Sequence, residues 1–186
     1  MQALCAAVSA DGFLIGFDYV GPHRNQYPYE HWNEVWKLNN TLPEPFRKQL
    51  SYPHLKTMLA TDPTEAIHSE LILDVTARYF DFVDHKKVGG ALAYEILNFN
   101  KGLIQADSAS RDHWVKYIMD RDLHFTYTAS SYFDYYACRP RKAALKDPAA
   151  LAFADDEVKR EQRASNNGGV YYEPTVLQHL YDLVKI

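Results

Sequence analysis

The sequence predicts an α+β fold, in which a mostly helical single domain over residues 1–186 carries a small antiparallel sheet. Several segments place apolar residues at helical spacing, whereas two short segments alternate apolar and polar residues or are rich in β-branched and aromatic ones. A chain of this length suits one domain and can bury a core without disulfides. Its apolar fraction of 47% and charged fraction of 24% are ordinary for a globular protein.

The first expected element is a β-hairpin over residues 2–20. Alternating apolar residues flank the dipeptide Asp11-Gly12 on both sides, and this arrangement is a strong short-range hairpin signal. Residues 4–12 also resemble the LAGLIDADG signature of homing endonucleases, and the resemblance implies that Asp11 would bind a catalytic metal. Ser9 stands where that family usually has an acidic residue. Since a hairpin turn explains the same residues, we predict the hairpin.

Helices are expected to occupy most of the next hundred residues. Pro28 suits the first turn of a helix that extends to about Leu38. Asp62 and Glu65 form a start signal for a helix over residues 63–83. The apolar spacing predicts further helices over 44–60 (one or two pieces), 91–105 and 110–120.

The second expected strand covers residues 123–128. This segment is rich in β-branched and aromatic side chains, which favours a strand that pairs with the N-terminal hairpin. A basic stretch and then an alanine-rich, charged stretch follow, so residues 139–169 are expected to form a helical appendage or hinge region. A last helix is expected from Pro174 onward.

The bulk composition argues against several classes of protein. With 20 basic and 24 acidic residues, the chain lacks the basic excess that a general nucleic-acid binder uses against phosphates. No stretch approaches the roughly 18 apolar residues of a membrane span, and the N-terminus lacks a secretory signal. Two cysteines, Cys5 and Cys138, are too few for a disulfide scaffold. We therefore expect a soluble, cytoplasmic protein with no membrane partner.

The preferred interaction surface mixes tyrosines with cations. Tyr and Arg are enriched in protein interfaces, although rings beside cations also suit single-stranded nucleic acid. The candidate binding residues are Tyr132, Tyr135, Tyr136, Arg139, Arg141 and Lys142, with Tyr171 and Tyr172 as a second candidate surface. Because the chain has no basic excess, we expect a protein partner. The chain would then be a non-enzymatic accessory protein without a cofactor, of the kind that phages and plasmids encode.

A small metal-dependent hydrolase is the alternative. On a helix, Glu30 and Glu34 share a face, and Asp81 with Asp84 would supply a second pair of carboxylates from a facing helix. Oxygen ligands of this kind suit Mg²⁺ or Mn²⁺. The same glutamates also fit a solvated helix face beside packed tryptophans, so the sequence leaves open whether the chain is an enzyme.

Three further positions carry functional residue types without a complete motif. His124 is a candidate acid or base, because residues 124–126 have the His-x-Thr form of two-histidine phosphoesterases, but the chain has no second copy. Glu95 lies within an apolar helix, where a covering partner would raise its pKa. Whether the loop over residues 23–27 lines a pocket is also left open.

Overall fold

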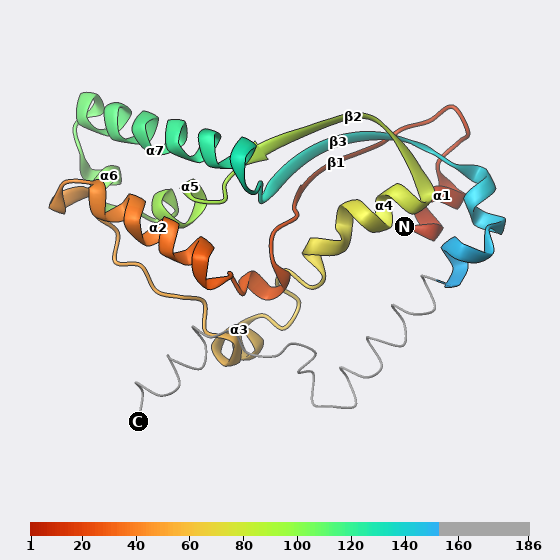
Figure 1. The fold of residues 1–186 in the computed structure, drawn as a ribbon, viewed down its shortest axis with the longest axis horizontal. Helices are drawn as coiled ribbons and strands as arrows, with labels where there is room; N and C mark the ends of the chain where they lie inside the picture. Colours follow the sequence, from red (N-terminus) through yellow and green to blue (C-terminus); the bar gives the residue numbers. More distant parts are fainter. Residues whose placement is uncertain (153–186) are drawn as a thin grey trace. The chain divides into compact units, whose positions relative to one another are not determined.

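The computed structural model describes residues 1–152 (Figure 1). Its helices are α1 (Gln2–Ala7), α2 (Tyr29–Thr41), α3 (Leu55–Thr61), α4 (Ile72–Tyr79), α5 (Ala93–Leu97), α6 (Lys101–Gln105) and α7 (Ser108–Thr128). Its strands are β1 (Leu14–Tyr19), β2 (Phe80–Gly89) and β3 (Phe133–Pro140). The predicted fold class, helices with a small antiparallel sheet, is confirmed.

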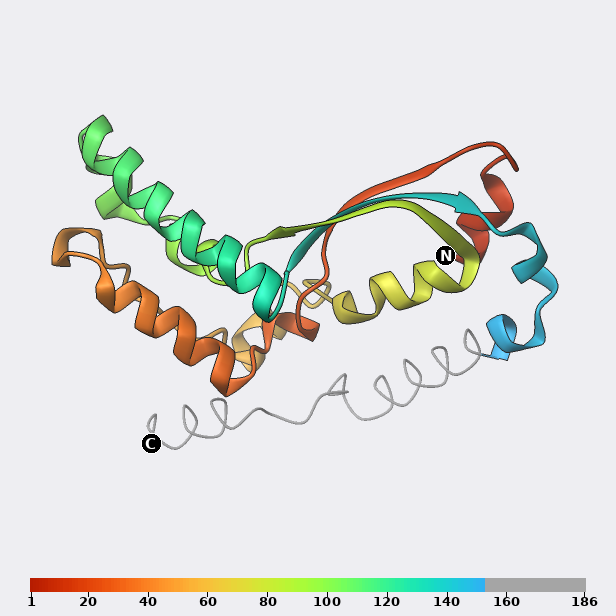
Figure 2. The same cartoon turned by 45° about the horizontal axis from the view of Figure 1, so that its top comes forward.

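The sheet has the strand order β1-β3-β2, so the last strand in the sequence lies between the first two (Figure 2). A close approach between β1 and β3 depends on a glycine. A Cβ atom at Gly16 would lie 2.2 Å from Cζ of Tyr136, so any side chain at this position would displace the buried tyrosine ring. β1 and β2 form the two edges of the sheet, and both precede the central strand β3 in the sequence.

The described chain divides into two compact units. Unit 1 comprises Met1–Gly16, Leu71–His85 and residues 136–152, and unit 2 comprises Phe17–Glu70 and Lys86–Tyr135. Each unit has its own hydrophobic core.

In unit 1, polar contacts anchor the ends of helices and strands around a small core that contains Cys5, Tyr79 and Cys138. The Cys5 thiol donates to the Tyr79 carbonyl at 3.2 Å. The Lys142 ammonium donates to the carbonyls of Cys5, Ala6 and Val8, which are the unpaired acceptors at the end of α1. Burial raises the pKa of Cys138 to about 11, so this thiol is protonated at neutral pH.

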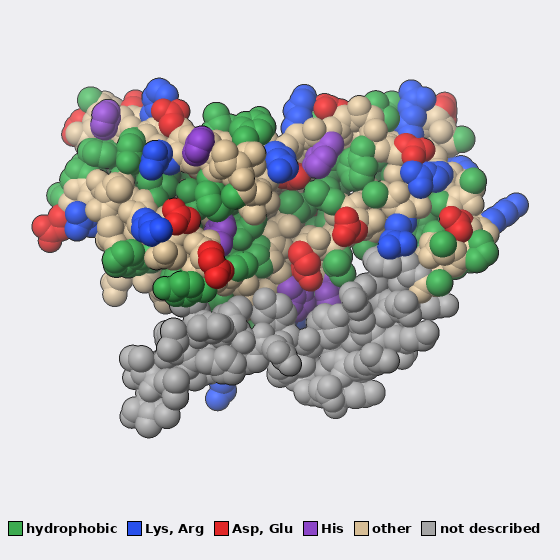
Figure 3. Space-filling model, viewed as in Figure 1, with side chains coloured by type: hydrophobic (Ala, Val, Ile, Leu, Met, Phe, Trp, Pro, Cys, Tyr) green, Lys and Arg blue, Asp and Glu red, His purple; other side chains and the backbone are tan. Residues whose placement is uncertain are grey.

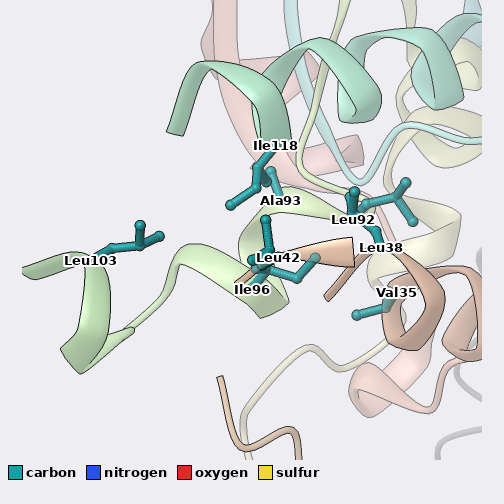
Figure 4. Packing of buried hydrophobic residues seen from close by; sticks show 8 residues of the cluster. All are labelled: Val35, Leu38, Leu42, Leu92, Ala93, Ile96, Leu103 and Ile118. Carbon is teal, nitrogen blue, oxygen red and sulfur yellow. The ribbon is translucent and has the colours of Figure 1, made fainter. Parts of the chain in front are cut away.

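In unit 2, α5 packs against both α2 and α7 around an aliphatic core (Figure 4). α2 contributes Val35 and Leu38 to this core, and Leu42 follows at its C-terminal end. The core residues are Val35, Leu38, Leu42, Leu92, Ala93, Ile96, Leu103 and Ile118.

An aromatic cluster forms the second core of unit 2. The ring of Tyr27, only 1% exposed, stacks on Trp32 and on Tyr132, with centroids 5.7 Å apart in both pairs. The ring of His31 stacks on Tyr132 at 4.5 Å. The Tyr27 hydroxyl donates to Glu95 at 2.7 Å, so this glutamate binds a neighbouring side chain. Burial raises the pKa of Tyr27 far above its ordinary value, since the phenolate would lose its hydration.

A buried carboxylate, Asp122 on α7, holds the turn between β2 and α5. It is 1% exposed and accepts hydrogen bonds from the backbone N–H groups of Gly90 at 2.7 Å, Leu92 at 2.7 Å and Ala93 at 3.0 Å. The turn passes through Gly89 and Gly90, whose φ angles of 108° and 84° favour glycine. The carboxylate therefore satisfies the free amides of a helix N-terminus and compensates for its own burial.

Two of the strand predictions are wrong. Residues 2–7 form α1 instead of the first strand of a hairpin, and residues 123–128 are the last turns of α7. The β-propensity of the second segment is overridden because Asp122 and Thr126 lie on the buried face of a continuous helix, one turn apart. Cation capping by Lys142 accounts for the short helix at the N-terminus.

The predicted helix boundaries are also corrected in part. The helix that starts after Pro28 is confirmed as α2. Of the expected helix over 63–83, residues 72–79 are helical and residues 80–83 belong to β2. The expected helix over 91–105 is interrupted at Phe99, whose φ of 52° is left-handed. The parts of the predicted appendage and last helix beyond residue 152, with Tyr171 and Tyr172, lie outside the described residues.

Within residues 1–152, no helix combines the length and the apolar character that crossing a bilayer requires.

Replacement of the buried carboxylate should destabilise unit 2 strongly. We expect Asp122→Ala to lower the free energy of unfolding by roughly 2–4 kcal/mol, because three amides lose a charged acceptor inside the protein. The matched control is Asp120→Asn on the same helix, whose exposed carboxylate pairs with Lys116 and should change stability by less than about 0.5 kcal/mol. Urea unfolding of both variants measures the difference, and equal effects would contradict the role of Asp122.

Candidate functional site

An open apolar groove in unit 2 is the strongest candidate for a binding site. It has a volume of about 640 Å³ and is formed by residues from β1, β2, β3, α5, α7 and the turns around α5. Its lining residues are Phe17, Val88, Gly89, Gly90, Ala93, Tyr94, Leu97, Asn98, Phe99, Met119 and Phe133. None of them is charged. Hydrophobic side chains reach the surface along α7 and where it meets the end of β2 (Figure 3).

Aromatic rings form one wall of this groove. Phe133 stacks on Phe17 with centroids 6.2 Å apart and contacts Tyr94 at 5.3 Å. Phe17 is 61% exposed and Phe99 is 81% exposed, so both offer their faces to solvent. Large apolar side chains exposed together mark interaction sites more often than the single exposed residues found on every protein.

The groove is supported from beneath by the same contacts that fix the turn after β2. Gly89, Gly90 and Ala93 line its floor, and Asp122 binds the amides of two of them. On the next turn residue, the Ala91 carbonyl lies 2.6 Å from Nε2 of His31. At the rim, Phe99 holds its exposed ring on a left-handed backbone, and such strain in a non-glycine residue is concentrated at binding and switching sites.

The residues of the predicted Tyr/Arg surface do not form one exposed patch, because some of them are buried. Tyr132 is 7% exposed and Tyr136 is 2% exposed, so both rings belong to hydrophobic cores. Tyr135 is half-buried beside the Lys86 ammonium, and the exposed Arg139 lies over the Phe13 ring at 4.9 Å. Arg141 donates to Asp81, and Lys142 caps α1. Of the six residues, Arg139 and Arg141 are exposed and Tyr135 is half-buried.

The prediction that Asp81 and Asp84 share a helix face is wrong. Asp81 and Asp84 lie on β2, where residues three apart point to opposite faces, so the helical spacing that would pair them is absent. Asp81 instead accepts a hydrogen bond from Arg141 at 3.0 Å. Glu30 and Glu34 do lie on one helix, α2, and Glu34 is paired with Lys37 at 2.6 Å.

Two of the catalytic candidates meet in a smaller cleft between α2 and α7. Glu34 and His124 both line this cavity of about 270 Å³, together with Lys37 and Arg121. His124 is exposed on helix α7 instead of a strand, so the His-x-Thr pattern lacks the strand geometry that its motif implies. The carboxylate of Glu34 pairs with Lys37, and Arg121 is the remaining charged residue of a largely apolar lining.

A third group of functional side chains combines His23, His68 and Glu70. One potential ligand atom from each residue lies within 4.8 Å of the others, and within residues 1–152 this is the one group of three or more His, Cys, Asp or Glu that is so arranged. None of Asp11, Glu30, Glu34, Asp81 and Asp84 belongs to it. The sequence carries no motif for this group, because its members come from segments 45 residues apart; the open question about the loop over 23–27 was the nearest signal.

Comparisons with known proteins identify no relative. No protein-family model matches the chain, and no curated protein or solved structure is significantly similar to it. The site must therefore be interpreted from its own geometry.

The histidine beneath the groove should make stability depend on pH. Burial lowers the pKa of His31 below its ordinary value of 6.5, partly offset by its hydrogen bond to Ala91 and by the charges of Asp122 and Glu34. As the pH falls below 6.5 the unfolded chain takes up this proton before the folded one does, so the contribution of neutral His31 to stability is lost.

We expect the melting temperature of the wild-type protein to fall more steeply between pH 7 and pH 5 than that of His31→Gln. The glutamine side chain has an N–H donor for the Ala91 carbonyl and does not titrate. His113→Gln, at an exposed position of α7, serves as the control and should keep the wild-type slope. Parallel profiles for wild type and His31→Gln would contradict the assignment.

Proposed function

We propose that the chain is a non-enzymatic binding protein whose groove receives an apolar segment of a partner protein. One observation carries this proposal: eleven uncharged residues from separate elements surround one open groove that presents exposed aromatic rings. Depletion of charge, with enrichment of aromatic residues and methionine, is the composition of the buried centre of protein interfaces. Met119 adds an adaptable, polarizable contact at the groove wall.

The openness of the groove favours a protein segment over a small molecule. Pockets for small ligands enclose most of the ligand surface, whereas this groove is open along its length and exposes Phe17, Tyr94 and Phe99 by 61%, 43% and 81%. Its volume of about 640 Å³ accommodates several large side chains of a bound segment. Burial of that apolar area, at about 25 cal/mol per Å², is the expected driving force.

The same features disfavour the other classes of ligand. No cation lines the groove, and a net charge of -4 gives little general attraction to phosphates. A metal-dependent hydrolase built on Glu30, Glu34, Asp81 and Asp84 stays a prediction with less support, since Asp81 binds Arg141 and Glu34 binds Lys37.

The test selects ligands from a displayed library of random peptides against the immobilised full chain. We expect the enriched peptides to share two or more large apolar residues. In fluorescence anisotropy, their affinity should fall at least tenfold for Phe99→Asp and for Met119→Lys, because each change places a charge at the contact. Circular dichroism checks that the variants stay folded.

Tyr127→Asp is the matched control, since Tyr127 is 72% exposed on α7 but does not line the groove. The Tyr127→Asp variant should bind the selected peptides with the same affinity as the wild-type chain. A library that yields no binder, or binders that ignore both groove variants, would rule out the groove as the binding site. Binders that respond to Tyr135→Ala and Arg139→Ala instead would place the interaction on the predicted Tyr/Arg surface.

A further inference from the structure

The side chains of His23, His68 and Glu70 converge in unit 2, apart from the apolar groove. His23 is 4% exposed, His68 is half-buried and Glu70 is exposed, so the group has a buried end and a solvent-accessible end. The two imidazole rings lie 4.8 Å apart with an interplanar angle of 34°. One ligand atom from each residue lies within 4.8 Å of the others.

Hydrogen bonds to backbone carbonyls join the two segments that carry these side chains. The N–H of Arg24 donates to the Ala66 carbonyl at 2.8 Å, and the hydroxyl of Ser69 donates to the Gly21 carbonyl at 2.8 Å. Ser69 is 3% exposed, so the second bond lies inside the protein. The convergence of the two histidines is therefore built by the fold and does not depend on loose surface side chains.

The backbone at this junction is unusually strained. Within residues 1–152, five non-glycine residues have a positive φ, and four of them, Arg24, Asn25, Ala66 and His68, lie in these two segments. Left-handed non-glycine residues persist where the surrounding structure over-determines them, often at ligand clamps.

We propose that His23, His68 and Glu70 form a binding site for one divalent cation of the zinc class. Two imidazole nitrogens and one carboxylate oxygen are the protein ligands of many zinc sites that keep a fourth position open. Mg²⁺ and Ca²⁺ prefer oxygen ligands alone, so this donor set selects against them. The exposed Glu70 leaves the fourth position accessible to water, which fits a site that exchanges its ion with solvent.

One hydrogen bond must be exchanged when the cation binds. The backbone N–H of His68 donates to Nδ1 of His23 at 2.8 Å, which places the proton of the neutral His23 ring on Nε2. Ligation through Nδ1 replaces this hydrogen bond, and ligation through Nε2 requires the other tautomer. Both routes sacrifice one interaction, so we expect micromolar affinity, weaker than that of a fully preformed structural zinc site.

The experiment titrates the full chain, first treated with a chelator, with Zn²⁺ by calorimetry and with Co²⁺ by visible absorption. We expect one ion per chain and the absorption bands of four-coordinate Co²⁺ with nitrogen ligands. His68→Gln and Glu70→Gln should each weaken binding at least tenfold. Mg²⁺ at the same concentrations should give no stoichiometric binding. His23 is buried and holds a backbone amide, so it is not the residue of choice for substitution.

The matched controls are His113→Gln and Glu65→Gln, two exposed positions outside the group. Both should bind Zn²⁺ like the wild-type chain. The proposal is overturned if the wild-type chain binds no Zn²⁺ at stoichiometric levels, or if binding survives both His68→Gln and Glu70→Gln. Neither outcome affects the apolar groove, whose lining shares no residue with this site.

Discussion

The arrangement of unit 2 depends on one buried carboxylate. Asp122 on α7 accepts hydrogen bonds from three backbone amides between the end of β2 and the first residue of α5, so it fixes where the chain turns after β2. That turn supplies the floor of the apolar groove and presents the Ala91 carbonyl to His31. A long helix, a short helix and a strand are thereby fixed relative to one another by a residue that exposes 1% of its surface.

Part of the high aromatic content lies in the interior of the described chain. Tyr27, Tyr79, Tyr132 and Tyr136 are all less than 10% exposed. Tyr27 stacks on Tyr132, and Tyr136 contacts Phe82 edge to face. Buried hydroxyls find partners in the protein, as when Tyr79 donates to the Ala150 carbonyl at 2.9 Å. An abundance of tyrosine in a sequence therefore does not by itself indicate a protein-binding surface.

Local signals in the sequence predicted what depends on local physics. The fold class and the start of α2 after Pro28 followed from periodicity and turn chemistry. The segments 2–7 and 123–128 were misassigned because distant groups decide their conformation: Lys142 caps the first, and the second continues a helix whose buried face carries Asp122 and Thr126. The groove and the His23 group draw on segments far apart in the chain, which no spacing rule detects.

The strand order has a consequence for synthesis. β3 separates β1 from β2, so neither of the earlier strands has its sheet neighbour until residues 133–140 have left the ribosome. Pairing over such long sequence separations is slow because the closure entropy must be overcome before the contacts form. Meanwhile the nascent chain exposes Phe80 of β2, which is fully buried in the folded protein in the same core as Tyr136 and Cys138 of β3. Chaperones are therefore expected to bind the nascent chain before the central strand is synthesised.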